Sequence, residues 1–82
     1  MNITVTYKTP EYENIVQIDR RQEIDAGLSV LQETGKTNYS GEPGFFRSYS
    51  LRQMVSAYCT FEELDIYSGD ILIAEDSYRN AK

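Results

Sequence analysis

The sequence predicts an α+β fold in which a mixed sheet of four to five strands wraps around one helix. Three observations predict it: an alternating pair of strands at the start, one apolar stripe at helical spacing, and a final strand introduced by a tight turn. With 82 residues, a single domain is expected. We assign this domain to residues 1–76 and expect residues 77–82 to form a polar tail.

The first 18 residues carry the pattern of a β-hairpin. Every second side chain from Ile3 to Tyr7 is apolar or aromatic, and threonines lie between them. This alternation is typical of a strand with one buried face. Thr9-Pro10 interrupts the pattern, and apolar residues resume at Ile15–Ile18. Two short strands so close together indicate a hairpin.

The period then changes from that of a strand to that of a helix. Ile24, Leu28 and Leu31 are spaced so that they form one apolar stripe on a helix. We expect this helix over Gln22–Thr34, ending at Gly35, because glycine commonly follows the last helical turn. The only large apolar surface available to the stripe is the inner face of the strands.

Two positions leave details of this helix open. Asp19, with Gln22 three residues later, could cap the N-terminus, and a later start is the alternative. Gly27 lies inside the helix, where glycine costs about 1 kcal/mol relative to alanine. We interpret Gly27 as a point of close approach between the helix and the sheet.

The rest of the chain consists of short strands separated by turn residues. A loop rich in glycine, asparagine and proline is expected at residues 36–44. Strands are then expected at Phe45–Tyr49, Met54–Ala57 and Ile71–Glu75. The first and last strands of the chain are the most apolar, so we expect them to pair in parallel in the middle of the sheet.

The segment Thr60-Phe61-Glu62-Glu63-Leu64-Asp65-Ile66-Tyr67-Ser68-Gly69-Asp70-Ile71-Leu72 has a recognisable order of features. Thr60 and Glu63 have the spacing of a capping box, Leu64 and Ile66 are candidates for the core, and Gly69-Asp70 begins the last strand. This ending, after a hairpin and a helix, resembles the β-grasp (ubiquitin-like) fold. The amino-acid sequence of this segment resembles the YukD- and EsaB-like family of bacterial ubiquitin-like proteins associated with type VII secretion.

The resemblance implies a non-enzymatic, cytoplasmic accessory of a type VII secretion system. Its partner would be a protein, a membrane component of the secretion machine. Residues 77–82 read Ser-Tyr-Arg-Asn-Ala-Lys and contain no diglycine, so we expect neither conjugation nor sulfur carriage. The alternative is a small ubiquitin-like regulatory or modifier/carrier protein outside secretion.

The composition argues against several other function classes. The chain has no histidine, so the usual general base and the commonest metal ligand are missing, and its one cysteine, Cys59, excludes a thiolate zinc site within one chain. We therefore expect no catalytic residues, no metal and no cofactor. A net charge of −5 disfavours a nucleic-acid partner. No apolar run approaches the length that spans a bilayer, so direct membrane insertion is not expected.

Aromatic residues and arginines gather in the region of the third and fourth strands. We choose Phe46, Arg47, Tyr49 and Arg52 as the candidate protein-binding face, because tyrosine, phenylalanine and arginine are enriched at interfaces. Phe45 and Phe46 are adjacent on a strand, so one of the two should point away from the helix. A homodimer contact or strand addition at a sheet edge is the alternative use of this region.

Overall fold

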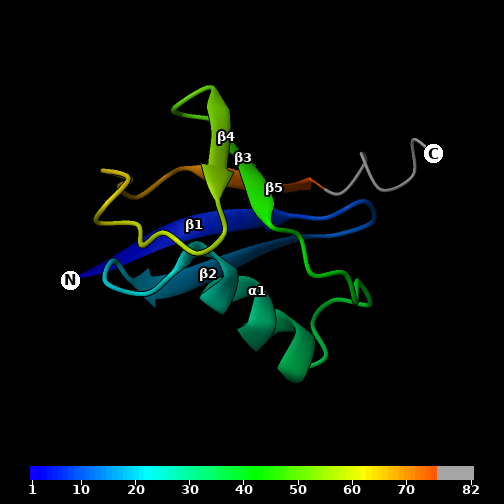
Figure 1. The fold of residues 1–82 in the computed structure, drawn as a ribbon. Coiled ribbons are helices and arrows are strands. Elements are labelled where there is room, and N and C mark those ends of the chain that lie inside the picture. Colours follow the sequence, from blue (N-terminus) through cyan, green and yellow to red (C-terminus); the bar gives the residue numbers. More distant parts are fainter. Residues whose placement is uncertain (76–82) are drawn as a thin grey trace.

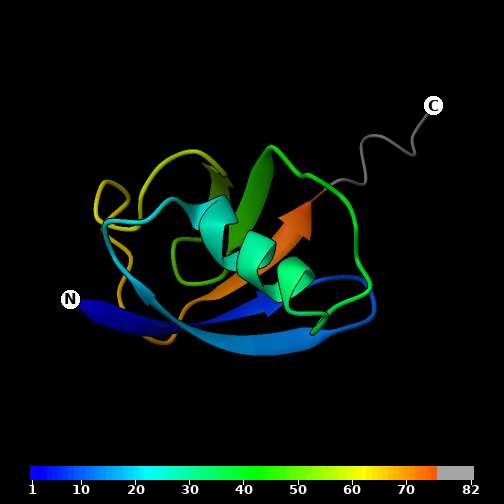
Figure 2. The ribbon, with the colours of Figure 1, turned by 90° about the horizontal axis from the view of Figure 1, so that it is seen from below.

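A computed structural model describes residues 1–75 of the chain. The elements are β1 (Asn2–Lys8), β2 (Glu13–Asp19), α1 (Ile24–Glu33), β3 (Phe45–Ser48), β4 (Gln53–Ser56) and β5 (Ile71–Glu75). The strands form one five-stranded sheet, and α1 lies against one of its faces (Figures 1 and 2). The predicted α+β sheet around one helix is therefore confirmed. The end assigned to the domain, residue 76, and the tail at 77–82 lie outside the described residues.

The strand order is β2-β1-β5-β3-β4, with the β1–β2 pair on one side of β5 and the β3–β4 pair on the other. β1 pairs with β5 in parallel, with Thr6 opposite Ile71 and Lys8 opposite Ile73. All other pairs of neighbouring strands are antiparallel. The parallel pairing of the first and last strands was predicted, and it puts β5 in the centre of the sheet. Among residues 1–75, no helix is both long and apolar enough to cross a membrane.

The helix is shorter than the predicted range of Gln22–Thr34 because its N-terminus is satisfied from a distant segment. The N–H groups of its first two residues donate to the carbonyl oxygens of Cys59 (2.9 Å) and Ala57 (3.0 Å). Asp19 does not cap the helix, and its carboxylate instead accepts a hydrogen bond from the backbone N–H of Arg21 at 2.8 Å. The helix therefore starts at the later of the two positions considered.

The predicted C-terminal glycine cap is confirmed. Gly35 has a left-handed φ of 75°, which a residue without a side chain adopts at no steric cost. This turn lets the N–H of Lys36 donate to the carbonyl oxygen of Leu31 at 2.9 Å, closing the end of the helix. β3 ends at Ser48, one residue before its predicted end, and β4 begins and ends one residue earlier than predicted. The reason is that the antiparallel pairing of the two strands stops at Ser48 and starts again at Gln53.

The core lies between the inner face of the sheet and the apolar stripe of α1. Ile24, Leu28 and Leu31 of the helix are buried, as predicted, and the sheet contributes Ile3, Val5, Tyr7, Ile18, Phe46, Val55 and Leu72. Ile66 is buried too, and Leu64 packs against the edge of this cluster. The rings of Tyr7 and Phe46 meet edge to face, with centroids 5.9 Å apart and planes at 85°. Such pairs add to the stabilisation given by burial alone.

Tyr7 ties β1 to the helix at Gly27. Its buried hydroxyl donates to the carbonyl oxygen of Ile24 at 2.6 Å. A Cβ atom placed on Gly27 would overlap the hydroxyl and the ring of Tyr7. The interpretation of Gly27 as a point of close approach is therefore confirmed, and the contact that requires it is the tyrosine ring.

Replacing Gly27 with alanine should destabilise the fold, although helix propensity alone favours alanine by about 1 kcal/mol. The ring of Tyr7 is held by its hydrogen bond and cannot move aside without disturbing the core. We expect a net loss of about 1–3 kcal/mol in the free energy of unfolding, measured by urea denaturation. Gly44→Ala is the matched control, because open space surrounds Gly44. Equal stability of the two variants would contradict the close packing.

The same tyrosine should make the protein sensitive to alkali. Burial, reinforced by the charge of Asp25, raises the pKa of Tyr7 well above its ordinary value of 10. Above about pH 10 the unfolded chain loses this proton and the folded chain keeps it, so stability falls as pH rises. Tyr7→Phe should cost about 1 kcal/mol at pH 7 through the lost hydrogen bond.

The variant should also lose stability less steeply than the parent between pH 9 and about 11, as followed by urea denaturation at each pH. Tyr49→Phe is the control, since the side chain of Tyr49 is exposed and the same hydroxyl is removed outside the core. If Tyr7→Phe and Tyr49→Phe show the same slope, the buried phenol is not the cause of the alkaline instability.

Candidate protein-interaction surface

Phe46 does not belong to the predicted face, and this part of the prediction is wrong. Its side chain is 0% exposed and lies in the core, whereas Phe45 is 49% exposed. Neighbouring residues on a strand point to opposite faces, so Phe46 and Arg47 cannot share one. Arg47 faces outward, and the aromatic side chain on its side of β3 is Phe45. The alternation of side chains along the strand would have predicted that Phe45, and not Phe46, shares the face of Arg47.

The other three predicted residues lie together on the outer face of the sheet. Arg47, Tyr49 and Arg52 line one hollow of about 360 Å³, and Ile73 of β5 lines it too. Arg47 lies opposite Ile73 in the β3–β5 ladder, so the guanidinium group and the isoleucine are neighbours across the strands. The sequence did not indicate the contribution of Ile73, because it depends on the pairing of β3 with β5.

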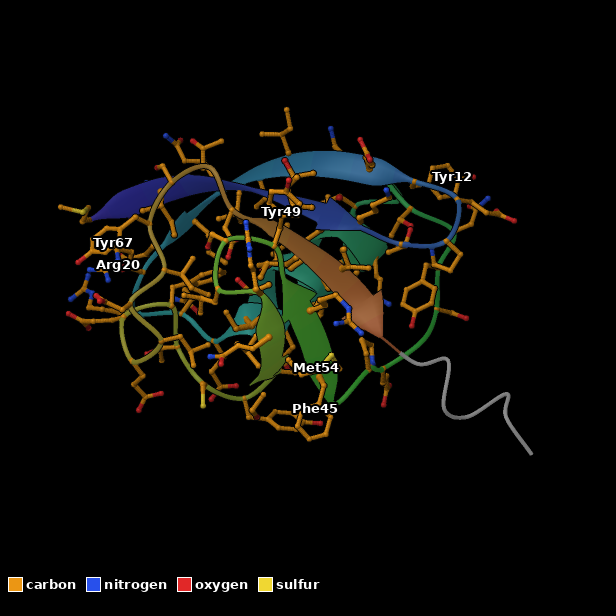
Figure 3. All side chains as sticks on the ribbon, turned by 90° about the horizontal axis from the view of Figure 1, so that it is seen from above. Tyr12, Arg20, Phe45, Tyr49, Met54 and Tyr67 are labelled. Carbon is orange, nitrogen blue, oxygen red and sulfur yellow. The ribbon has the colours of Figure 1, made fainter. Side chains whose placement is uncertain are left out.

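Exposed apolar side chains extend this hollow along β3 and β4. Tyr49 is 68% exposed, and Met54, opposite Arg47 in the β3–β4 ladder, is 42% exposed. Figure 3 looks onto the sheet from the side opposite the helix and shows Met54 close to Phe45 at one end and Tyr49 towards the other. We call the group Phe45, Arg47, Tyr49, Arg52, Met54 and Ile73 the outer-face patch.

The loop that carries Tyr49 and Arg52 is fixed by a buried carboxylate. Asp70 is 2% exposed, and one of its oxygens accepts a hydrogen bond from the hydroxyl of Ser48 at 2.6 Å. Its other oxygen accepts from the backbone N–H of Ser50 at 2.9 Å. The Ser48 hydroxyl oxygen in turn accepts from the N–H of Leu51 at 3.2 Å. These hydrogen bonds order the β3–β4 turn that carries the side chains of Tyr49 and Arg52.

Asp70 also joins this turn to the two central strands. Its carbonyl oxygen accepts from the N–H of Thr6 in β1 at 3.0 Å. Immediately before it, Gly69 has a φ of 100° and donates its N–H to the carbonyl oxygen of Thr4 at 2.8 Å. The "Gly-Asp-Ile-Leu" ending recognised in the sequence therefore has a definite structural purpose. It holds β1, β5 and the β3–β4 turn in one arrangement.

Arg52 has an unusual backbone conformation at the end of that turn. Its φ is 57°, in the left-handed region that residues with a side chain rarely adopt. Its N–H donates to the carbonyl oxygen of Ser48 at 2.9 Å, which closes the turn before β4. This conformation favours glycine sterically, so the arginine is held there at a cost of about 1 kcal/mol or more.

Three basic residues outside the patch, Lys8, Arg20 and Arg21, have nearby partners at the surface. Arg21 forms a two-pronged contact with Asp19, whose hydrogen bond from the guanidinium group holds the pKa of Asp19 well below its usual range. Lys8 lies 3.6 Å from Glu13. Arg20 stacks on the ring of Tyr67, 4.3 Å from its centroid (Figure 3). These contacts stabilise local structure at the surface.

Comparison with known proteins agrees with the fold. No family model matches the chain, and no curated protein matches it. The structure is similar to the ubiquitin-like domain of an Arabidopsis thaliana protein determined in solution by NMR, with a TM-score of 0.62 and 18% identity. The likeness covers 88% of this chain and 73% of that chain. The chain has a ubiquitin-like β-grasp fold.

Two further hollows lie elsewhere on this ubiquitin-like domain. One of about 320 Å³ is formed by the β1–β2 turn and the loop after α1, where the amide of Asn38 donates to the hydroxyl of Tyr12 at 2.8 Å. The other, of about 310 Å³, lies beside α1 and is flanked by Asp25, Glu42 and Tyr58. Within residues 1–75, no group of three or more acidic or cysteine side chains is arranged to hold a metal ion.

Removal of the Asp70 carboxylate should loosen both the fold and the outer-face patch. Asp70→Ala leaves the Ser50 N–H and the Ser48 hydroxyl without their acceptor, so we expect about 3 kcal/mol less stability in urea denaturation. Asp70→Asn should cost about 1 kcal/mol, since an amide oxygen still accepts one of these bonds. Hydrogen exchange at Ser50 and Leu51 should speed up in Asp70→Ala.

Glu62→Ala is the control for this experiment, because Glu62 is an acidic residue with an exposed side chain. Equal loss of stability in Asp70→Ala and Glu62→Ala, or unchanged exchange at Leu51, would show that the carboxylate does not hold the turn.

Proposed function

We propose that the chain is a non-enzymatic protein-interaction module that binds its partner through the outer-face patch. The observation that carries this proposal is the gathering of exposed aromatic, thioether and guanidinium groups around one hollow. Tyrosine, phenylalanine, methionine and arginine are the residue types that protein interfaces favour over the rest of the surface. Tyr49 in particular offers a large ring with a polar end, which suits the centre of an interface.

The rigidity of the patch supports the same role. Phe45 and Met54 lie on paired strands, and the Asp70 hydrogen bonds order the turn that carries Tyr49. A surface that is ordered before binding loses less conformational freedom when the partner arrives. The patch is therefore suited to surface contact with a protein, in agreement with a small domain whose interior is filled by its own core.

For the biological setting, we propose a cytoplasmic accessory of a type VII secretion system that binds a membrane component of that machine. This proposal is supported by the resemblance of Thr60–Leu72 to the YukD- and EsaB-like family. The capping box within that segment is formed, with the Glu63 N–H donating to the Thr60 hydroxyl oxygen at 3.0 Å. The ubiquitin-like fold agrees with this family, and a fold by itself does not determine a function.

A cross-linked pull-down from the native cell tests the binding role. Tyr49→Ala should lower recovery of the partner by about 10- to 30-fold, as expected for truncation of a large aromatic residue at an interface. Phe45→Ala should have a smaller effect in the same direction. Tyr58→Ala is the matched control, because Tyr58 is also exposed and lies outside the patch, beside the helix.

Two outcomes would contradict the proposal in different ways. If Tyr49→Ala and Tyr58→Ala recover the same partner equally while both remain folded, the outer-face patch is not the binding surface. If the partner depends on Tyr49 but is unrelated to secretion, the assignment to a type VII system fails and the role as an interaction module stands.

A further inference from the structure

Two arginines line the hollow of the outer-face patch, on a chain with a net charge of −5. The described residues that line it are Arg47, Ser48, Tyr49, Arg52 and Ile73, and none of these five carries a carboxylate. Of the two other hollows, the one beside α1 is lined by Asp25 and Glu42, and the one at the β1–β2 turn by Glu11. The described surface therefore has a basic hollow on one side of the sheet and an acidic hollow beside the helix.

We propose that the basic hollow receives an acidic side chain from an extended, acidic segment of the partner protein. An apolar residue next to that acid would contact Phe45 and Met54, which extend the hollow along the strands. This inference rests on the proposed function, and it specifies the chemistry of the partner. It requires only the positions of the two guanidinium groups, whatever else Arg47 contacts.

The chemistry of the hollow suits a carboxylate. Guanidinium groups present a planar fork of donors that matches the two oxygens of Asp or Glu. The hydroxyl of Tyr49 offers a further donor near the same hollow, and Ile73 provides an apolar wall that limits access of water to the pair. Charged hydrogen bonds formed in such partly sheltered places are stronger than those formed in open water.

Charge also decides between the occupants. A nucleic acid needs a row of cations along its backbone, and this hollow offers two arginines on an acidic chain. An acidic segment of a protein needs only local contact with those two side chains. The acidic hollow of a second copy of the chain is a competing occupant of like chemistry, and the experiment below separates it from a partner protein.

The test pans a random library of 12-residue peptides on the full 82-residue chain. We expect enriched peptides with at least two Asp or Glu residues next to an aromatic or branched apolar residue. The best peptide is then synthesised, and its affinity is measured by fluorescence anisotropy. Arg52→Gly should weaken its binding by about 5- to 10-fold, corresponding to the loss of one charged contact. Binding should also weaken as salt is raised from about 0.05 M to 0.5 M.

Arg52→Gly is a suitable variant because the left-handed φ of 57° at this position is one that glycine adopts without strain. The turn should therefore persist, and the thermal unfolding temperature of the variant protein should be equal to that of the parent or higher. Lys36→Gln is the matched control: it removes the same unit of charge from an exposed residue after α1, far from the patch. It should change the affinity of the peptide by less than about twofold.

Each other result overturns a defined part of the inference. Enriched peptides that are neutral or basic, but still depend on Tyr49, overturn the acidic partner and leave the interaction surface in place. Acidic peptides that bind Arg52→Gly as well as the parent overturn the role of the hollow. If panning yields no peptide whose binding depends on Tyr49, the outer-face patch is not a binding surface. A dimer in gel filtration that Arg52→Gly dissociates assigns the hollow to a second copy instead of a partner.

Discussion

The buried carboxylate of Asp70 is the point on which the arrangement of the sheet depends. Its two oxygens accept hydrogen bonds from Ser48 and Ser50, and its carbonyl oxygen accepts one from Thr6. A charge with so little exposure is tolerated because each oxygen has donors arranged around it. The end of the last turn, the start of β5 and the β3–β4 turn are thereby held together, and the outer-face patch lies on the strands that meet there.

The two faces of the sheet differ in what covers them. On the inner face, Tyr7 fills the space that Gly27 leaves open and satisfies a helical carbonyl oxygen with its hydroxyl. On the outer face nothing covers β3 and β4 among the described residues, so Phe45, Tyr49 and Met54 remain exposed. A domain this small has one helix and can cover only one face of its sheet. The uncovered face is the natural place for contact with another protein.

The sequence predicted the order of elements well, because each has a local pattern: alternation from Ile3 to Tyr7, and a stripe from Ile24 to Leu31. The error at Phe46 came from grouping adjacent residues on one face, and strand parity could have prevented it. The burial of Asp70 could not have been predicted, since aspartate after a turn glycine is usually solvated. The N-terminus of α1 depends on carbonyl groups at residues 57 and 59, which no local pattern connects to it.

The central place of β5 has a consequence for how the chain folds during synthesis. Within residues 1–75, the strands of the β1–β2 hairpin do not pair with those of the β3–β4 hairpin, and β5 joins the two hairpins. Thr6 pairs with Ile71, so the contact that unites the sheet links residues from nearly opposite ends of the described chain. The inner edges of β1 and β3 therefore have no strand partner until residues 71–75 have left the ribosome. Closure of this sheet is a late event, and until then the unpaired edges of β1 and β3 are the part of the nascent chain most exposed to association with other strands.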